Sequence, residues 1–217
     1  MTEPQRFPER WDAQKADHAY PCKAPIRAAG LVALADLDPE LAGFHAARLL
    51  VDPSTSRLSG EPGKTAAGIL AAQSQQLALY LYTLREGQHD DVSAECLRHL
   101  ADAPDSIAHT LCTRFGPEAS EAAQLGLIDM LLARPDRLRF REELRARLRT
   151  PGALTVFRYL AVVMAASRRR DLVAEVIAAV EAERDPQRLA ALAEALALLP
   201  NDREATRALE LAQARMI

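Results

Sequence analysis

A recurring helical hairpin constrains this chain more than any other feature. Residues 26–50 read as two short helices joined by a tight turn, and related stretches recur through the 217-residue sequence. Asp38 is a good N-cap for a second helix beginning at Pro39, because its carboxylate can accept from free amide groups and proline lacks only a donor that a first turn does not use. The first helix carries an apolar stripe at helical spacing, formed by Ala28, Leu31, Leu34 and Ala35. So short a pair cannot bury this stripe alone, so it must stack on another pair.

The recurrence is visible when residues 28–37 are laid on later segments. The segment 66–75 matches closely, and 94–103, 122–131, 157–166 and 189–198 match more loosely. The fourth column of this alignment holds Leu31, Ile69, Leu97, Leu125, Leu160 and Leu192, and the seventh holds Leu34, Ala72, Leu100, Ile128, Val163 and Ala195. Each opening helix is followed by a break and a second helical stretch. The sequence therefore predicts about six antiparallel helical pairs, joined by loops of uneven length.

This pattern resembles the HEAT/armadillo-like α-solenoids, and in particular the short HEAT-like repeats of bacteria, over residues 25–217. A basic residue shortly before the alanine pair is common in those repeats, and Arg27 and Lys64 match it. The resemblance implies an all-α, right-handed superhelix with a concave binding face, in a cytoplasmic bacterial protein. It carries no catalytic residue or cofactor over to this chain.

Composition agrees with an all-α domain. Hydrophobic residues make up 49% of the chain, mostly Ala and Leu, and only 5% are aromatic, whereas sheets favour aromatic and β-branched residues. Nearly every proline after Pro21 falls at a proposed helix edge, where it costs little. No run of 18 apolar residues predicts a membrane span, and residues 1–10 contain no hydrophobic secretory segment. Three cysteines (Cys22, Cys96 and Cys112) suit reduced intracellular thiols better than a disulfide framework.

Three segments carry expectations of their own. Residues 1–24 precede the repeats and form either a helix that caps the first pair, anchored by Trp11 and Tyr20, or a tail. The break at 53–63 is either a passive loop or a binding insertion; its glycine spacing does not fit a phosphate loop. Near the C-terminus, Asn201 with Glu204 three residues later predicts a capping box for the last helix.

One constellation has the residue types of a metal site. Cys96 and His99 lie on one predicted helix, His109 and Cys112 on the next, symmetric about the turn at Pro104. Two thiolates and two imidazoles form a legitimate tetrahedral zinc set. The alternative is two ordinary thiols at the packing margin with exposed histidines, and we predict no metal or cofactor.

Charge is concentrated in one segment. From Arg134 to Arg170 the sequence contains eleven arginines and only three carboxylates. The net charge of this segment is +8, in a chain whose total is −3. If the second helices line a groove, Arg137, Arg141 and Arg145 can face it and form forked contacts to phosphate or carboxylate. The alternatives are a solvated helix flank and pairing with the acidic units. The predicted binding set comprises Arg134, Arg137, Arg141, Arg145, Arg168 and Arg169.

Two functions follow from these patterns. The first is a non-enzymatic scaffold that binds a protein or peptide on its concave face. The second is a nucleic-acid-binding protein similar to the HEAT-like alkylpurine DNA glycosylases, motivated by the segment 134–170. Those enzymes use tryptophans within their repeats, whereas Trp11, the single tryptophan here, precedes them. The sequence favours the scaffold.

Overall fold

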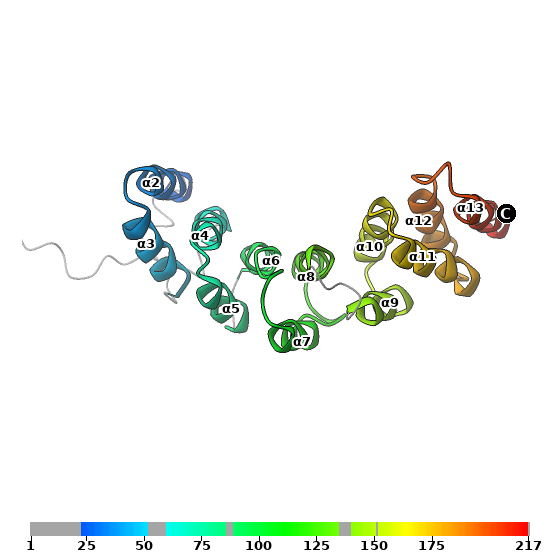
Figure 1. The fold of residues 1–217 in the computed structure, drawn as a ribbon, viewed down its shortest axis with the longest axis horizontal. Helices are drawn as coiled ribbons and strands as arrows, with labels where there is room; N and C mark the ends of the chain where they lie inside the picture. Colours follow the sequence, from blue (N-terminus) through cyan, green and yellow to red (C-terminus); the bar gives the residue numbers. More distant parts are fainter. Residues whose placement is uncertain (1–22, 52–59, 86–88, 135–139, 151, 217) are drawn as a thin grey trace, which may run out of the picture. The chain divides into compact units, whose positions relative to one another are not determined.

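The chain is helical throughout the part that the computed structural model describes, which comprises residues 23–51, 60–85, 89–134, 140–150 and 152–216. These residues form twelve α-helices and no strand, which confirms the all-α prediction (Figure 1). The helices are α2 (Lys23–Leu37), α3 (Pro39–Val51), α4 (Gly60–Ala72), α5 (Gln76–Leu84), α6 (Asp90–Arg98), α7 (Asp105–Arg114), α8 (Glu121–Ala133), α9 (Arg141–Arg149), α10 (Leu154–Ala166), α11 (Arg170–Ala182), α12 (Pro186–Leu196) and α13 (Arg203–Met216). The chain divides into two compact units, residues 1–99 and 100–217.

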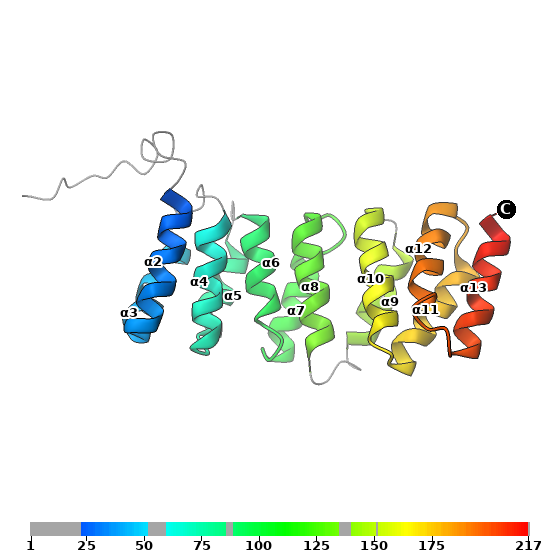
Figure 2. The ribbon, with the colours of Figure 1, turned by 90° about the horizontal axis from the view of Figure 1, so that it is seen from above.

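The first unit contains two layers of helices. α4 packs against both α2 and α6, and α3 packs against α5 (Figures 1 and 2). The predicted hairpin is confirmed, since α2 ends at Leu37 and α3 begins at Pro39. The Leu41 amide donates to the Asp38 carboxylate at 3.0 Å, as expected of an N-cap. Buried Leu31 and Leu50 belong to the core of this unit.

Close approach of α4 and α6 depends on Gly63. A Cβ atom at this position would lie 2.7 Å from one methyl of Val92 and 2.9 Å from the other. Val92, on α6, is itself buried, so it has little room to give way. The glycine therefore allows the two helices to pack without a steric clash.

The second unit repeats the layered packing. α10 packs against α8 and α12, α9 packs against α11, and α13 closes the unit against α12 and α11 (Figure 2). α10 is apolar, as its sequence suggests, and buries Phe157, Leu160 and Met164. The fourth alignment column is mostly internal. Leu31, Leu97, Leu160 and Leu192 are buried, while Ile69 and Leu125 are half-buried.

Side chains cap the starts of α3, α8, α12 and α13, with one correction to the sequence-based expectation. Asp185 caps α12 by accepting from the Gln187 amide at 2.7 Å, with Pro186 as the first helical residue. The predicted cap at Asn201 is wrong, because α13 begins at Arg203 and the Asp202 carboxylate accepts from the amides of Glu204 and Ala205. Asp202 stands one residue closer to the helix, where its carboxylate reaches the second and third amides.

Several expectations fall on residues outside this description. The N-terminal cap or tail (residues 1–22) and most of the break at 53–63 lie outside the described residues, although the end of that break, from Gly60, belongs to α4. Among the described helices, none combines the length and apolarity needed to cross a membrane.

Candidate functional site

The arginines from 134 to 170 differ in their burial and in their contacts. Arg134, predicted as a binding residue, is only 5% exposed. Its guanidinium donates to the carbonyls of Ala101 at 3.1 Å and Ala103 at 2.7 Å, and to the Asp105 carboxylate at 2.6 Å. It also lies 4.9 Å from the centroid of the Phe140 ring. Arg134 therefore fastens the turn before α7 and presents little surface to a partner.

Four further arginines, which we call clasp arginines, donate to carbonyls at the C-terminal ends of helices. Each follows its acceptor by 32 to 40 residues: Arg85 donates to Leu50, Arg147 to Cys112 and Phe115, Arg188 to Leu148 and Thr150, and Arg215 to Val180 and Glu181. A helix C-terminus has unpaired carbonyls and a negative dipole end, so a guanidinium there satisfies both. These residues hold α3, α7, α9 and α11 in place.

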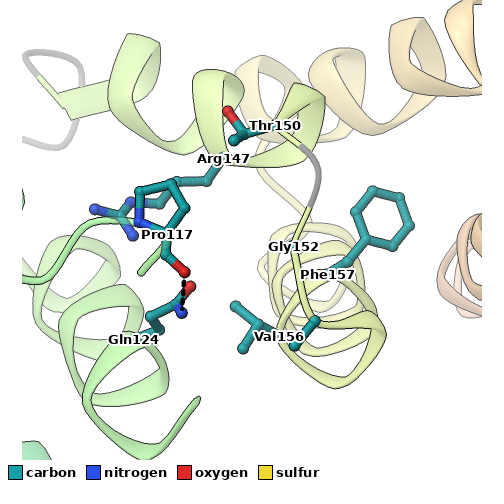
Figure 3. Close-up of a pocket in the computed structure, with 8 residues that line it drawn as sticks. Pro117, Gln124, Arg147, Thr150, Gly152, Val156 and Phe157 are labelled. Carbon is teal, nitrogen blue, oxygen red and sulfur yellow. Dashed lines mark hydrogen bonds between the residues drawn. The ribbon is translucent and has the colours of Figure 1, made fainter. Parts of the chain in front are cut away.

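Figure 3 shows the surroundings of Arg147. This side chain, 7% exposed, also pairs with Glu143 at 2.8 Å. Beside it, the Gln124 amide donates to the carbonyl of Pro117 at 3.0 Å, and Val156 and Phe157 are among the other lining residues (Figure 3). The space between these residues is about 20 Å³, which suits a single water molecule. These contacts hold neighbouring helices together, so the role of this region is structural.

The two described arginines of the predicted groove lie together on α9. Arg145 approaches the Glu175 carboxylate of α11 at 3.0 Å, and Arg141 approaches it at 3.8 Å. Glu175 is only 12% exposed, so its charge needs these partners. Pairing within the chain was one of the alternatives left open by the sequence. Arg137 lies outside the described residues, and the groove itself stays a prediction.

Arg169 is also engaged. Its guanidinium makes a forked contact to Asp171, at 3.2 Å and 3.1 Å, in the first turn of α11. These hydrogen bonds lower the pKa of Asp171 below its ordinary value. The pair fixes the backbone at the start of α11. It therefore also fixes the orientation of the residues on either side of Arg169.

Those neighbours, Arg168 and Arg170, are different. Both are exposed, and neither guanidinium forms an ion pair or hydrogen bond with another described residue. Arg168 has a φ of 53°, in the left-handed region that glycine adopts most readily. We name these two residues the arginine pair; of the two, only Arg168 belongs to the predicted binding set.

The arginine pair lines a hollow of about 400 Å³ between the start of α11 and the turn joining α12 to α13. Its apolar lining comes from Val173, Leu198 and Leu199, and its polar rim from Asn201 and Asp202. Leu198 is 46% exposed, so it presents apolar surface beside the hollow. A second hollow, of about 360 Å³, adjoins it along α11 and shares Arg170, Val173 and Asp202. We call the first hollow the arginine pocket.

The proposed zinc ligands have other contacts. Cys96 and Cys112 are buried, and burial raises the pKa of Cys112 to about 11 and that of Cys96 still further, so both stay protonated at neutral pH. His99 lies 3.1 Å from Glu95, and the His109 ring packs 5.0 Å from that of Phe140. Across the described ranges, no three His, Cys, Asp or Glu side chains gather as a metal site. Zinc binding by these residues gains no support.

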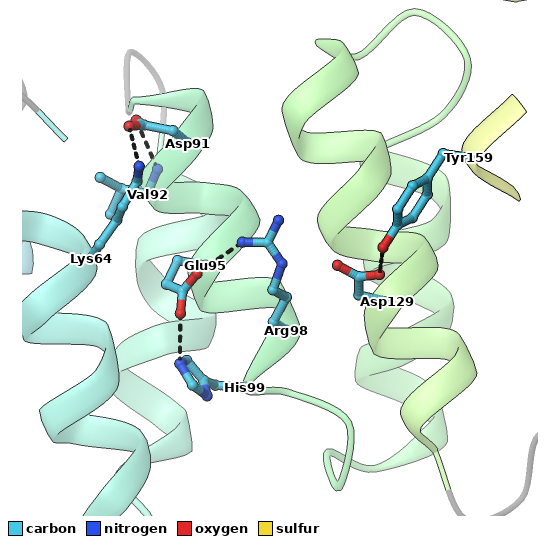
Figure 4. Close-up of polar contacts among 8 residues, drawn as sticks. All are labelled: Lys64, Asp91, Val92, Glu95, Arg98, His99, Asp129 and Tyr159. Carbon is cyan, nitrogen blue, oxygen red and sulfur yellow. Dashed lines mark hydrogen bonds and ion pairs between the residues drawn. The ribbon is translucent and has the colours of Figure 1, made fainter. Parts of the chain in front are cut away.

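Two other polar groups lie on helix surfaces (Figure 4). In the first unit, Lys64 pairs with Asp91 at 3.1 Å, and Glu95 pairs with Arg98 at 2.8 Å. In the second unit, the Tyr159 hydroxyl donates to the Asp129 carboxylate, which links α10 to α8. These contacts join neighbouring helices or neighbouring turns of one helix. Each partner satisfies the other, which is the arrangement of a structural contact.

Among the described residues, the arginine pocket therefore has the clearest binding chemistry. Two cationic forks lie beside an apolar wall, so the pocket can take a ligand that combines negative charge with apolar surface. Comparison of the chain with protein-family models, with curated proteins and with solved structures finds no match.

Proposed function

We propose that this protein is a non-enzymatic binding scaffold, a right-handed superhelix of about six helical pairs that holds a protein or peptide partner. The observation that carries the proposal is the arginine pocket, where Arg168 and Arg170 lie beside Leu198 without a described partner. Protein interfaces favour such a combination, because arginine and exposed apolar side chains supply both orientation and buried area. The layered helices of each unit support the superhelical arrangement, since such layers are the packing unit of repeat proteins.

The other arginines are less suited to recognition. Arg134 and Arg147 are almost fully buried, while Arg141, Arg145 and Arg169 have carboxylate partners within the chain. A partner that bound these five would have to break existing contacts. We therefore place partner binding at the arginine pocket.

Affinity capture from a lysate of the source cell, with and without nuclease, tests this function. The bait is the full chain, and the variant is Arg168→Gly with Arg170→Glu. The control is Arg149→Glu, at an arginine on α9 that is also exposed and lies outside the pocket. We expect a discrete protein that survives nuclease, is lost from the double variant and is retained by the control.

Two outcomes would overturn the proposal. Capture that collapses with nuclease would establish the nucleic-acid alternative, whose mark is a steep loss of affinity with salt. A protein partner retained equally by the double variant would exclude the arginine pocket as its site.

A further inference from the structure

We infer that the arginine pocket recognises the C-terminal carboxylate of a partner whose last residue is apolar. This inference rests on the proposed function and adds the chemistry of the partner. A terminal carboxylate is a planar anion with two acceptor oxygens, which matches the fork of a guanidinium. A segment that merely passes across the pocket offers only neutral peptide groups at its main chain.

The charge balance of the pocket favours a single anion at its arginine end. Arg168 and Arg170 are both exposed, and no described carboxylate lies within ion-pairing distance of either. Asp202 also lines the pocket, but its carboxylate already accepts from the amides of Glu204 at 2.9 Å and Ala205 at 3.1 Å. The pocket lining therefore carries two positive charges, from the arginine pair, against the one negative charge of Asp202, and its net charge is positive.

Apolar residues of the pocket lie where the last side chain would pack. Val173 is buried beneath the hollow, Leu198 is 46% exposed beside it, and Leu199 is half-buried. A volume of about 400 Å³ is within the range of small-ligand sites and leaves room for a leucine or valine side chain together with its carboxylate. The adjoining hollow along α11, whose lining includes Ala174, Ile177 and the acidic residue Glu204, can take the residue before it.

The conformation of Arg168 adds a further observation. A non-glycine residue at a φ of 53° is strained relative to glycine, which is the usual residue where a helix ends in this conformation. The strained residue here is a long cation at the rim of a hollow. Arg168→Gly should remove the charge and also relieve the strain. Loss of binding in this variant can therefore be separated from loss of stability.

The test is fluorescence anisotropy of the full chain with a labelled peptide pool, four random residues followed by leucine, with either a free C-terminus or a C-terminal amide. A charged hydrogen-bonded contact changes affinity by roughly tenfold or more. We expect the acid pool to bind at least tenfold more tightly than the amide pool. Arg168→Gly should abolish most of this preference while raising the melting temperature, and Arg149→Glu should leave it unchanged.

Other results would overturn the inference. Equal binding of the acid and amide pools would show that the carboxylate is not read. A preference that persists in Arg168→Gly combined with Arg170→Glu would place it elsewhere. If octanoate displaced the acid pool as strongly as unlabelled peptide does, the occupant would be a small carboxylate and not a protein terminus. Any of these results, alongside a nuclease-resistant partner that needs the arginine pair, would refute the inference while the scaffold function stood.

Discussion

Arg188 stacks on Phe157, with its guanidinium carbon 4.0 Å from the centroid of the ring. The same guanidinium donates to the carbonyl of Leu148 at 2.8 Å and more weakly to that of Thr150 at 3.4 Å. Its Nε lies 3.2 Å from the carboxylate of Glu183. One side chain of α12 therefore joins the C-terminal end of α9 to the core residue of α10, with only 15% of its surface exposed.

Replacing this residue should destabilise the second unit. Arg188→Ala removes a charged donor from the helix end and a cation from the ring face, contributions that together are worth about 2–3 kcal/mol. Urea denaturation measures the loss as a lower transition midpoint. Arg184→Ala, at an exposed arginine in the loop that precedes α12, is the control and should shift stability by less than about 0.5 kcal/mol. Equal effects of the two variants would mean that Arg188 contributes only through general surface charge.

A conservative change at Arg134 should be nearly as harmful as its removal. Arg134→Lys keeps the charge, but a lysine ammonium is a compact group that cannot span two carbonyls and the Asp105 carboxylate as the guanidinium does. We expect a loss of about 2–3 kcal/mol in the free energy of unfolding, because the site is buried and leaves acceptors unpaired. Arg149→Lys, on the exposed surface of α9, should be close to neutral. Full stability in Arg134→Lys would contradict the fork geometry.

The buried thiols predict a loss of stability in alkali. Burial raises the pKa of the Cys112 thiol to about 11 in the folded protein. In the unfolded chain the pKa of a cysteine thiol is about 8.5. Between these values the unfolded chain loses a proton that the folded chain keeps, so stability is present at neutral pH and falls as pH rises. The expected slope is up to about 1.4 kcal/mol per pH unit for this thiol.

Denaturation series from pH 8 to pH 11 would measure that slope. Cys112→Ala should make it shallower by the contribution of one thiol. Tyr82, whose pKa burial raises to about 12, contributes equally to both proteins above about pH 10, so it does not obscure the comparison. An unchanged slope in the variant would indicate that Cys112 titrates normally in the folded protein.

Much of the local structure could be predicted from sequence, because its causes are local. The stop at Leu37 and the start at Pro39 depend on Asp38 and proline, and both are readable from neighbouring residues. The cap of α13 was misplaced by one residue because Asn201 and Asp202 are both competent caps. Geometry alone decides which oxygen reaches the amides.

The candidate site was less predictable. Charge clustering identified the arginine segment, but the role of each arginine depends on what lies 30 to 40 residues away in the chain. Arg134 was predicted to bind a partner and instead donates to carbonyls near Ala101, while Arg170 was not singled out and lines the pocket. One signal was available, because the clasp arginines follow their acceptors at roughly the spacing of the predicted repeat. An arginine at that offset from a helix end is a reason to expect a structural clasp.

Two of the glycines of α4, Gly63 and Gly68, provide an internal contrast. At Gly68 an added Cβ meets nothing within 4 Å, so Gly68→Ala should stabilise the helix by about 0.5–1 kcal/mol through reduced chain entropy in the unfolded state. At Gly63 the same change places a Cβ 2.7 Å from Val92, and both methyls of that rigid side chain are in the way. Overpacking of this kind costs about 1–3 kcal/mol, which outweighs the gain in helix propensity. The melting temperature should therefore move in opposite directions for the two variants.

Gly63→Ala combined with Val92→Ala should relieve the clash and recover part of the lost stability, although it loses the packing of the valine. If Gly63→Ala were as stabilising as Gly68→Ala, α4 and α6 would have to lie further apart than they do here.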